Sequence, residues 1–199
     1  EQVKPMLSCY EQYMGPYPFW NDGFALIETP YLGMEHQSGI AYDNDYLTGY
    51  AGSDYSGIGL DFDYIIIHEA GHEWWGNNIT TADIADMWVH EGFCTYAEAL
   101  YVECMYDYEK AMDYVNAKKN WVANEAPIIG QYGVNKEGSG DMYRKGMLIL
   151  NTLRHIIGDD EVWFDIVLGL NTDFRHSIVT HDEVVNYINQ KTGKNFVPF

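Results

Sequence analysis

The stretch His68-Glu69-Ala70-Gly71-His72 has the pattern H-E-x-x-H and lies inside an apolar run that ends at Trp75. This run predicts a helix over residues 62–75. Positions four apart lie on the same face of a helix, so His68 and His72 can direct two imidazoles at one cation, with Glu69 beside them. Burying these polar groups without partners would be costly. The stretch therefore predicts a helix built around a metal site.

A third ligand is offered by Glu91, which follows His72 after eighteen intervening residues and opens a helix predicted over residues 88–106. Two histidines and a carboxylate, with the fourth position left to water, are typical of a catalytic zinc. We therefore expect one Zn²⁺ per chain, bound by His68, His72 and Glu91. The alternative without a metal is two core histidines bonded to the backbone.

The zinc interpretation assigns work to two further side chains. Glu69 would take a proton from a zinc-bound water and pass it to the leaving amine. Tyr143, at the start of a later helix, is the candidate phenol that hydrogen-bonds the developing oxyanion. The reaction class that these residue types favour is metal-assisted hydrolysis.

Composition and net charge limit the size of the core and the classes of partner that the protein can have. The 199 residues are 47% hydrophobic, enough for a sizeable core, and 16% aromatic, which suits an aromatic-lined cleft. The net charge of −19 argues against nucleic acid and against anionic membranes. It would mildly favour cationic substrates, or it serves solubility alone. We expect no membrane insertion, because the chain has no run of 18 apolar residues.

The three cysteines are Cys9, Cys94 and Cys104. Their odd number and the lack of a C-x-x-C pair predict buried free thiols. Cys94 and Cys104 fall in one predicted helix about 15 Å apart, which rules out a bond between those two.

Hydrophobic periodicity and turn residues predict an α+β fold that is mostly helical, with a small β element near the N-terminus. The predicted strands cover residues 24–28 and 34–42 and would pair as a ribbon. Loops are expected over 43–60 and 129–141. The remaining predicted helices cover residues 1–14, 80–86, 108–124, 142–157, 160–170 and 180–191, the last opening on a capping box at Thr180 and Glu183.

Four blocks follow one another along the chain: Leu32-Gly33-Met34-Glu35-His36, H-E-A-G-H-E-W-W-G-N at 68–77, D-M-W-V-H-E-G-F at 86–93, and Y-R-K-G at 143–146. In order and spacing they resemble the G-x-M-E-N, H-E-x-x-H-x-W-x-G-N, D-x-W-L-N-E-G-F and Y-x-K-G motifs of the M1 family of zinc aminopeptidases. These are the gluzincin relatives of aminopeptidase N and leukotriene A4 hydrolase. The resemblance implies a thermolysin-like catalytic domain over residues 1–199.

The same resemblance implies roles for individual residues. Glu35 would hold the free α-amino group of the substrate, and Gly33 and Met34 would line the cleft in extended form. Tyr143 would stabilise the tetrahedral intermediate. Glu98, seven residues after Glu91, and less strongly Asp86 would orient a zinc histidine, the alternative being ordinary surface or capping carboxylates.

The chain departs from the family pattern at three positions. Leu32 stands where Gly is usual, and His36 where Asn is usual, which affects the amine site. His90 replaces the usual Asn before the third ligand, and we expect it to be structural, as we do for His155, His176 and His181. The resemblance also implies flanking domains, a β domain before this region and helical domains after it. The sequence does not distinguish a cytoplasmic from a periplasmic or other extracytoplasmic location.

The function predicted is hydrolysis of the N-terminal peptide bond of peptides that carry a free amine. A related zinc endopeptidase or an epoxide hydrolase would share the metal site. A non-catalytic peptide-binding module is the alternative from a different class, although it would have no need of the acid–base residue Glu69.

Overall fold

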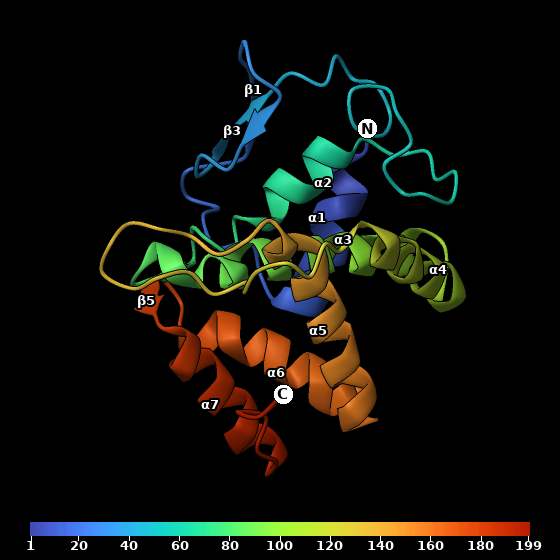
Figure 1. The fold of residues 1–199 in the computed structure, drawn as a ribbon. Coiled ribbons are helices and arrows are strands. Elements are labelled where there is room, and N and C mark those ends of the chain that lie inside the picture. The colour runs from blue at the N-terminus through green and yellow to red at the C-terminus, as the bar shows by residue number, and fades with distance from the viewer.

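The computed structural model describes residues 1–199 and confirms the mostly helical α+β architecture (Figure 1). Its α-helices are α1 Val3–Met14, α2 Tyr64–Gly71, α3 Trp88–Met105, α4 Tyr108–Lys118, α5 Asp141–Ile157, α6 Asp160–Asp173 and α7 His181–Thr192. Two 3₁₀ turns, η1 Ile84–Asp86 and η2 Lys119–Trp121, complete the helical elements. No helix is long and apolar enough to cross a membrane.

Helix α3 is the centre of the fold. Every residue from Trp88 to Val102 is buried, because α1, α2, α4 and α5 all pack against it. A helix that is covered on all sides has no need of a polar face, which explains the continuous apolar character of this stretch. Its few buried polar side chains are therefore those that require a structural or functional reason.

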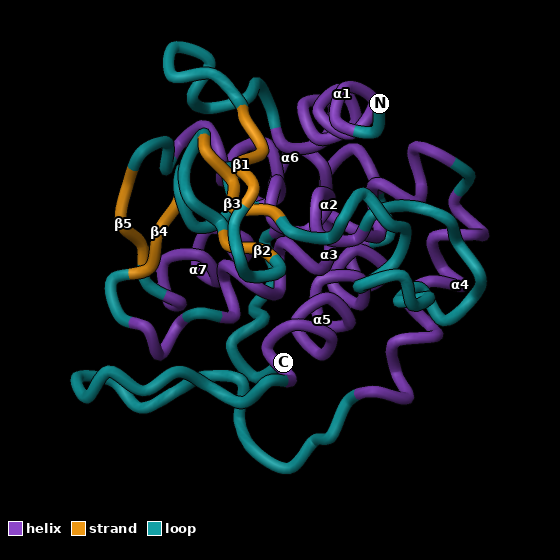
Figure 2. Tube along the Cα trace, turned by 90° about the horizontal axis from the view of Figure 1, so that it is seen from above, coloured by secondary structure: helices purple, strands orange, loops and turns teal.

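The small sheet near the N-terminus has the strand order β1-β3-β2, with β1 Ala25–Glu28, β2 Gly33–Met34 and β3 Gly39–Tyr42. The β element was predicted, but the predicted ribbon was wrong in detail. The segment predicted as one strand over 34–42 instead contributes to two, β2 and β3, which pair antiparallel, and β1 pairs with β3 in the parallel direction. Seen from above, β2 lies over the helical body near α2 and α3 (Figure 2), and it contacts α2.

A second, parallel pair joins β4 Ile79–Thr81 to β5 Ser177–Val179 and was not predicted. The helix predicted over residues 80–86 is replaced by β4 and the short turn η1. Thr80 pairs with Ile178 in the ladder, and Asp83 becomes the cap of η1 by accepting a hydrogen bond from Ala85 N. The tertiary pairing thus overrides the capping potential of the threonines.

Helix α2 begins where Asp63 accepts hydrogen bonds from Ile65 N and Ile66 N. It ends at Gly71, four residues earlier than predicted, and His72 follows in a tight turn. The helix predicted over 108–124 also ends early, at Lys118, and continues as η2. The capping box between Thr180 and Glu183 at the start of α7 is confirmed.

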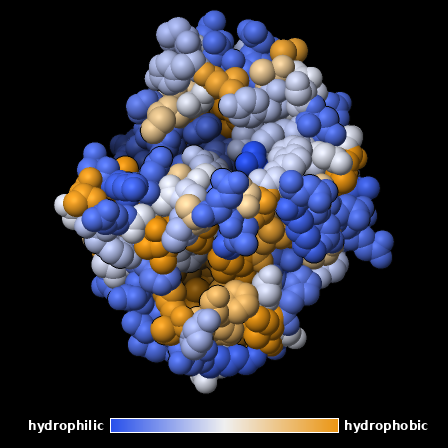
Figure 3. All heavy atoms as spheres, viewed as in Figure 1, coloured by the Kyte–Doolittle hydropathy of each residue, from blue (hydrophilic) through white to orange (hydrophobic).

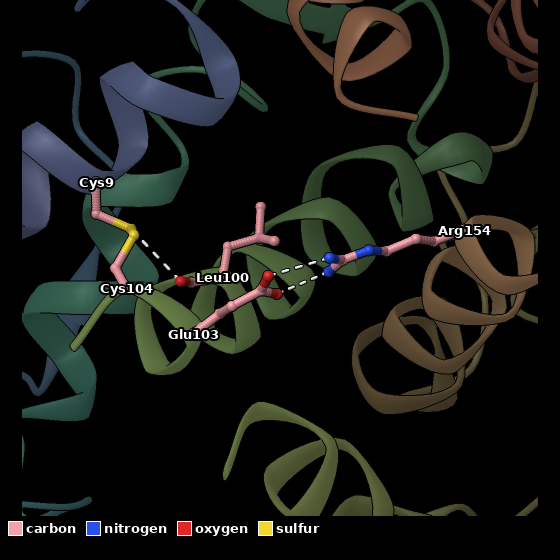
Figure 4. The surroundings of a disulfide bond; sticks show 5 residues. All are labelled: Cys9, Leu100, Glu103, Cys104 and Arg154. Carbon is pink, nitrogen blue, oxygen red and sulfur yellow. Dashed lines mark hydrogen bonds and ion pairs between the residues drawn. A yellow bond between two sulfur atoms is a disulfide. The ribbon is translucent and has the colours of Figure 1, made fainter. Parts of the chain in front are cut away.

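The prediction of three free thiols was wrong for two of them. Cys9 of α1 and Cys104 of α3 form a disulfide with a Cα–Cα distance of 6.1 Å (Figure 4). The packing of α1 against α3 creates this proximity, which no local pattern reveals. Cys94 is buried and free, as expected. Beside the disulfide, Glu103 of α3 accepts two hydrogen bonds of 2.7 and 3.0 Å from Arg154 of α5. The disulfide therefore links α1 to α3, and the ion pair links α3 to α5.

Candidate active site

The three predicted metal ligands meet where α2 packs against α3. The Oε2 atom of Glu91 lies 3.1 Å from Nε2 of His68 and 3.4 Å from Nε2 of His72. All three side chains are buried, and one ligand atom from each lies within 4.8 Å of the others. The structure therefore brings the three residues together as one candidate metal site.

The other ring nitrogens show which way the imidazoles are protonated. Nδ1 of His68 lies 2.8 Å from Oε1 of Glu98, and Nδ1 of His72 lies 2.9 Å from the carbonyl oxygen of Trp75. A carbonyl accepts only, as does an ionised carboxylate, so each Nδ1 carries the hydrogen. With each Nδ1 hydrogen held in this way, the two Nε2 atoms face Glu91 and are placed to bind a cation together with its carboxylate.

The charge balance of the site leads to the same conclusion. Burial acts to lower the pKa of His68, but Glu91 and Glu98 outweigh it, and the pKa is raised well above the ordinary value. Burial acts to raise the pKa of Glu91, but His68 and His72 outweigh it, and the pKa falls well below the ordinary value. The ligand set thus favours positive charge at its centre, which a divalent cation would supply. Two imidazoles and one carboxylate fit zinc.

Glu98 lies where the orienting role predicted for it requires. Its side chain is fully buried in α3, and its second oxygen accepts a hydrogen bond from the hydroxyl of Tyr114 in α4. Sequence reasoning missed Tyr114, since no motif marks it. It also missed the carbonyl of Trp75, because a backbone atom leaves no signature in the side-chain pattern.

Asp86, the weaker candidate for the same role, is occupied elsewhere. Its carboxylate accepts hydrogen bonds from the Tyr132 hydroxyl at 2.6 Å and from His181 N at 3.0 Å. It makes no hydrogen bond or ion pair with His68 or His72. Asp86 instead anchors the 129–141 loop and the start of α7 to η1.

His90 does not join the metal ligands. Its Nε2 accepts a hydrogen bond from Thr81 N at 3.0 Å, and burial lowers its pKa to about 4. It therefore stays neutral and ties α3 to β4, which confirms the structural role predicted for it.

Glu69 projects from α2 beside the ligands, and oxygen atoms of Glu69 and Glu35 lie with a His72 nitrogen in a second group within 4.8 Å. Burial raises the pKa of Glu69 above its ordinary value, while the two histidines act in the opposite direction. Gly33 makes this approach possible. A Cβ on Gly33 would lie 2.7 Å from Ile65 Cγ2 and 3.0 Å from Glu69 Oε1, so only glycine lets β2 come so close to α2.

These groups open into a cleft of about 640 Å³. Figure 3 shows a hollow on this face of the molecule, below the sheet. One wall is the segment Leu32, Gly33, Met34 and Glu35, and the floor carries the candidate metal ligands and Glu69. The other lining residues come from the 43–60 loop, the start of α2, the residue before α3 and the start of α5, namely Tyr50, Tyr55, Tyr64, Ile65, Met87, Gly140, Tyr143 and Arg144.

Tyr143 lies over the metal site. Its ring centroid is 5.8 Å from that of His68, with the planes inclined by 27°. Burial, and then the charge of Glu91, raise the pKa of Tyr143 well above the ordinary value. The phenol is therefore protonated across the physiological range and available as a donor.

The segment that carries Glu35 is hydrogen-bonded to the turn that follows α2. Asn77 Nδ2 donates to the carbonyl of Glu35 at 3.0 Å, and Oε1 of Glu73 accepts from Ser38 N at 2.6 Å. His36, one of the departures from the family motif, is exposed. Leu32 lines the cleft.

A family model described as "Peptidase family M1 domain" matches residues 1–199. The chain belongs to peptidase family M1. This M1 domain is 27% identical over 205 residues to endoplasmic reticulum aminopeptidase 1 of Mus musculus, a match that covers 94% of the chain and 20% of the mouse protein. It is 26% identical over 198 residues to leukotriene A-4 hydrolase of Xenopus laevis, covering 92% of the chain and 31% of the frog protein.

Solved structures show the same fold. The M1 domain superposes on an M1 zinc metallopeptidase from Deinococcus radiodurans with a TM-score of 0.76, 21% identity, and 96% and 40% of the two chains covered. For yeast LTA4 hydrolase in complex with bestatin the TM-score is 0.78 at 17% identity, with 94% and 31% covered. The M1 domain thus spans between a fifth and a third of the curated relatives named here.

Proposed function

We propose that this M1 domain is a zinc-dependent aminopeptidase that hydrolyses the N-terminal peptide bond of peptides. The observation that carries the proposal is the placement of Glu35, which offers a carboxylate oxygen within 4.8 Å of ligand atoms of Glu69 and His72. A carboxylate at this distance from the hydrolytic centre can pair with an ammonium group only if the scissile bond is close to the amino terminus. An internal peptide bond offers no such charge.

His68, His72 and Glu91 would hold the zinc, and Glu98 and the Trp75 carbonyl would fix the two rings. When bound, zinc polarises the scissile carbonyl and lowers the pKa of water towards ~7. Glu69 would accept the proton of the attacking water and deliver it to the leaving amine, for which its raised pKa is suited. Tyr143 would donate a hydrogen bond to the oxygen on which negative charge develops.

The backbone around Gly33 and Met34 would align the substrate. In the order β1-β3-β2, β2 is an edge strand, so its outer edge is free to pair with an extended peptide. The partners we propose are therefore peptides with a free amino terminus, together with the flanking domains that the family resemblance implies.

The test compares aminoacyl anilides with their N-acetylated counterparts on the zinc-loaded protein. We expect the free-amine substrates to be cleaved at least about tenfold faster in kcat/KM, because acetylation removes the charge that Glu35 recognises. Equal cleavage of both would refute the aminopeptidase proposal and favour an endopeptidase. No cleavage of either by a protein that holds zinc would favour a peptide-binding module.

A further inference from the structure

The cleft holds a single arginine in a chain that is strongly acidic. The protein has 11 Lys and Arg residues against 30 Asp and Glu, and the carboxylates Glu35, Glu69 and Glu91 all line the cleft. Arg144, the second residue of the Y-R-K-G block, is the only lysine or arginine in its lining. Arg144 lines the same cleft as Tyr143, Glu69 and the candidate metal ligands.

Arg144 lacks the partners that a guanidinium normally has. Its Nε is buried without any hydrogen-bond partner, and its one side-chain bond is a long one, 3.4 Å from Nη2 to the Tyr55 hydroxyl. No carboxylate lies within ion-pair distance of it. A guanidinium carries five N–H donors, and leaving buried donors unpaired is costly.

The other two arginines show what a satisfied guanidinium looks like in this chain. Arg154 is bound by Glu103 and Asp160 through four bonds of 2.7 to 3.0 Å. Arg175, which is exposed, donates to the carbonyl of Pro18. Arg144 thus differs from Arg154 in having a buried Nε donor without a partner and no carboxylate within ion-pair distance.

Arg144 lies near aromatic rings that also contact a second cation. Its guanidinium carbon lies 5.2 Å from the ring centroid of Trp121 and 5.8 Å from that of Tyr55. Behind these rings the fully buried Lys118 places its Nζ 3.6 Å from the centroid of Tyr55 and 4.6 Å from that of Trp121. Two cations therefore share one aromatic pair, and the lysine donates to the carbonyl of Tyr55.

We propose that Arg144 forms a subsite for a carboxylate of the substrate, so that this M1 domain favours short peptides with a carboxylate close to the free amine. The proposal rests on the proposed function. An anion in the cleft would pair with the terminal Nη donors of Arg144, whose one hydrogen bond is the long one to Tyr55, in the fork geometry that suits a carboxylate. The cleft would then recognise a zwitterion, its ammonium by Glu35 and its carboxylate by Arg144.

The carboxylate could be the C-terminal one of a dipeptide or an acidic first side chain, and two substrate pairs separate these sources. One pair is Ala-Ala and its C-terminal amide, and the other is glutamyl and glutaminyl anilide. For the zinc-loaded wild type we expect the carboxylate member of at least one pair to be favoured about tenfold or more in kcat/KM. The pair that responds identifies the source.

Three variants then assign the preference to Arg144. Arg144→Gln should lower the ratio within the responding pair by about tenfold or more, and Arg144→Lys should retain part of it, since an ammonium keeps the charge but not the fork. Arg175→Gln is the matched control and should keep the wild-type ratio. A ratio unchanged in Arg144→Gln, or no preference in either pair by the wild type, would overturn the proposal.

Calorimetric titration of the same peptides into zinc-loaded Glu69→Gln protein gives a readout that does not depend on turnover. Tighter binding of the carboxylate members there, with no hydrolysis by the wild type, would support the anion subsite and refute the peptidase. Hydrolysis that ignores the carboxylate would refute the subsite alone. Thermal melting shows whether Arg144→Gln folds. If it does not, the proposal is tested with Arg144→Lys, by comparing its affinity for the carboxylate and neutral members of each pair with that of the wild-type arginine.

Discussion

The two walls that meet at the reacting centre are built differently. On the helical wall of α2 and α3, His68, His72, Glu91 and Glu98 are buried, and both histidines have a fixed partner for Nδ1. On the sheet wall, β2 is only two residues long and Met34 is 43% exposed. Apart from its pairing with β3, the segment is held by two contacts from the turn after α2, those of Asn77 and Glu73.

This difference follows from what each wall has to do. Metal ligation requires donors fixed to within fractions of an ångström, and buried side chains with second partners provide that. Substrate binding tolerates more variation, because a peptide adapts to an edge strand through its own backbone. The two departures from the family's exopeptidase motif, Leu32 and His36, both lie on the sheet wall. Changes to the helical wall should therefore abolish chemistry or metal binding, and changes to the sheet wall should alter selectivity.

The largest effect is expected for Glu69→Gln on the helical wall. Removing the group that moves the proton should lower kcat by about 10²- to 10⁴-fold while zinc content stays at that of the wild type. Steady-state assays with an aminoacyl anilide and metal analysis measure the two. Glu125→Gln, on the exposed 122–140 segment, is the control, and wild-type turnover by Glu69→Gln would show that another group is the base.

The second-largest effect is expected for Glu98, whose carboxylate is bonded to Nδ1 of His68. Glu98→Gln should weaken zinc binding by about tenfold to hundredfold, because the amide is a poorer acceptor for Nδ1–H and no longer balances the charge of the metal. Tyr114→Phe should also weaken zinc binding, but by a smaller factor. Competition with a chelator measures the affinity. Tyr106→Phe, on an exposed tyrosine, should leave it unchanged, and equal affinity in all variants would refute the orienting role.

On the sheet wall, Glu35→Gln should lower the preference for free-amine over N-acetylated substrates by about tenfold, since the ammonium loses its counter-charge. Zinc affinity should not change, in contrast to Glu98→Gln. The comparison of anilides with their N-acetylated counterparts measures the preference, and competition with a chelator measures the zinc affinity. Glu28→Gln alters an exposed carboxylate of β1 and serves as control. A preference that survives in Glu35→Gln would place the amine site elsewhere.

The smallest effect concerns stability and Lys118, behind the cleft. Burial lowers the pKa of Lys118 to about 8, with Glu98 opposing and Arg144 assisting. In the unfolded chain the pKa is about 10.4. Between these values the unfolded state binds more protons, so stability rises with pH. From pH 7.5 to 9 the gain attributable to Lys118 should be about 1 kcal/mol.

Urea unfolding at a series of pH values tests this dependence. Lys118→Met should flatten the rise, whereas Lys110→Met, on a lysine in an exposed ion pair with Asp113, should preserve it. A rise of equal slope in Lys118→Met would show that another group titrates in this window.

The candidate metal site could be predicted from the sequence because its geometry is local. His72 keeps helical backbone angles at the end of α2, so it stays one turn from His68, and Glu91 lies in the first turn of a helix with a clear apolar pattern. The Cys9–Cys104 bond and the β4–β5 pair were not predictable, since each joins segments that only the packing of the whole chain brings together. The strands of that pair are three residues long, too short for any periodicity.

The surroundings of the ligands were only partly predictable. Glu98 could be inferred from its place on the helix of Glu91. The partner of His72 is the carbonyl of Trp75, which any residue would provide at that point of the turn, so Asp86 was given a role that the backbone fills. The unpaired state of Arg144 likewise depends on what surrounds it in three dimensions.

The bond between Cys9 and Cys104 closes a covalent ring with a sequence separation of 95. Glu35, the candidate metal ligands and Glu98 lie inside this ring. Tyr143 and Arg144 lie outside it on α5, which packs against α3 and is also joined to it by the salt bridge of Arg154 to Glu103. A protease that cuts the exposed part of the 43–60 loop would therefore not release the N-terminal piece. The two fragments would migrate as one on a gel until a reductant separated them.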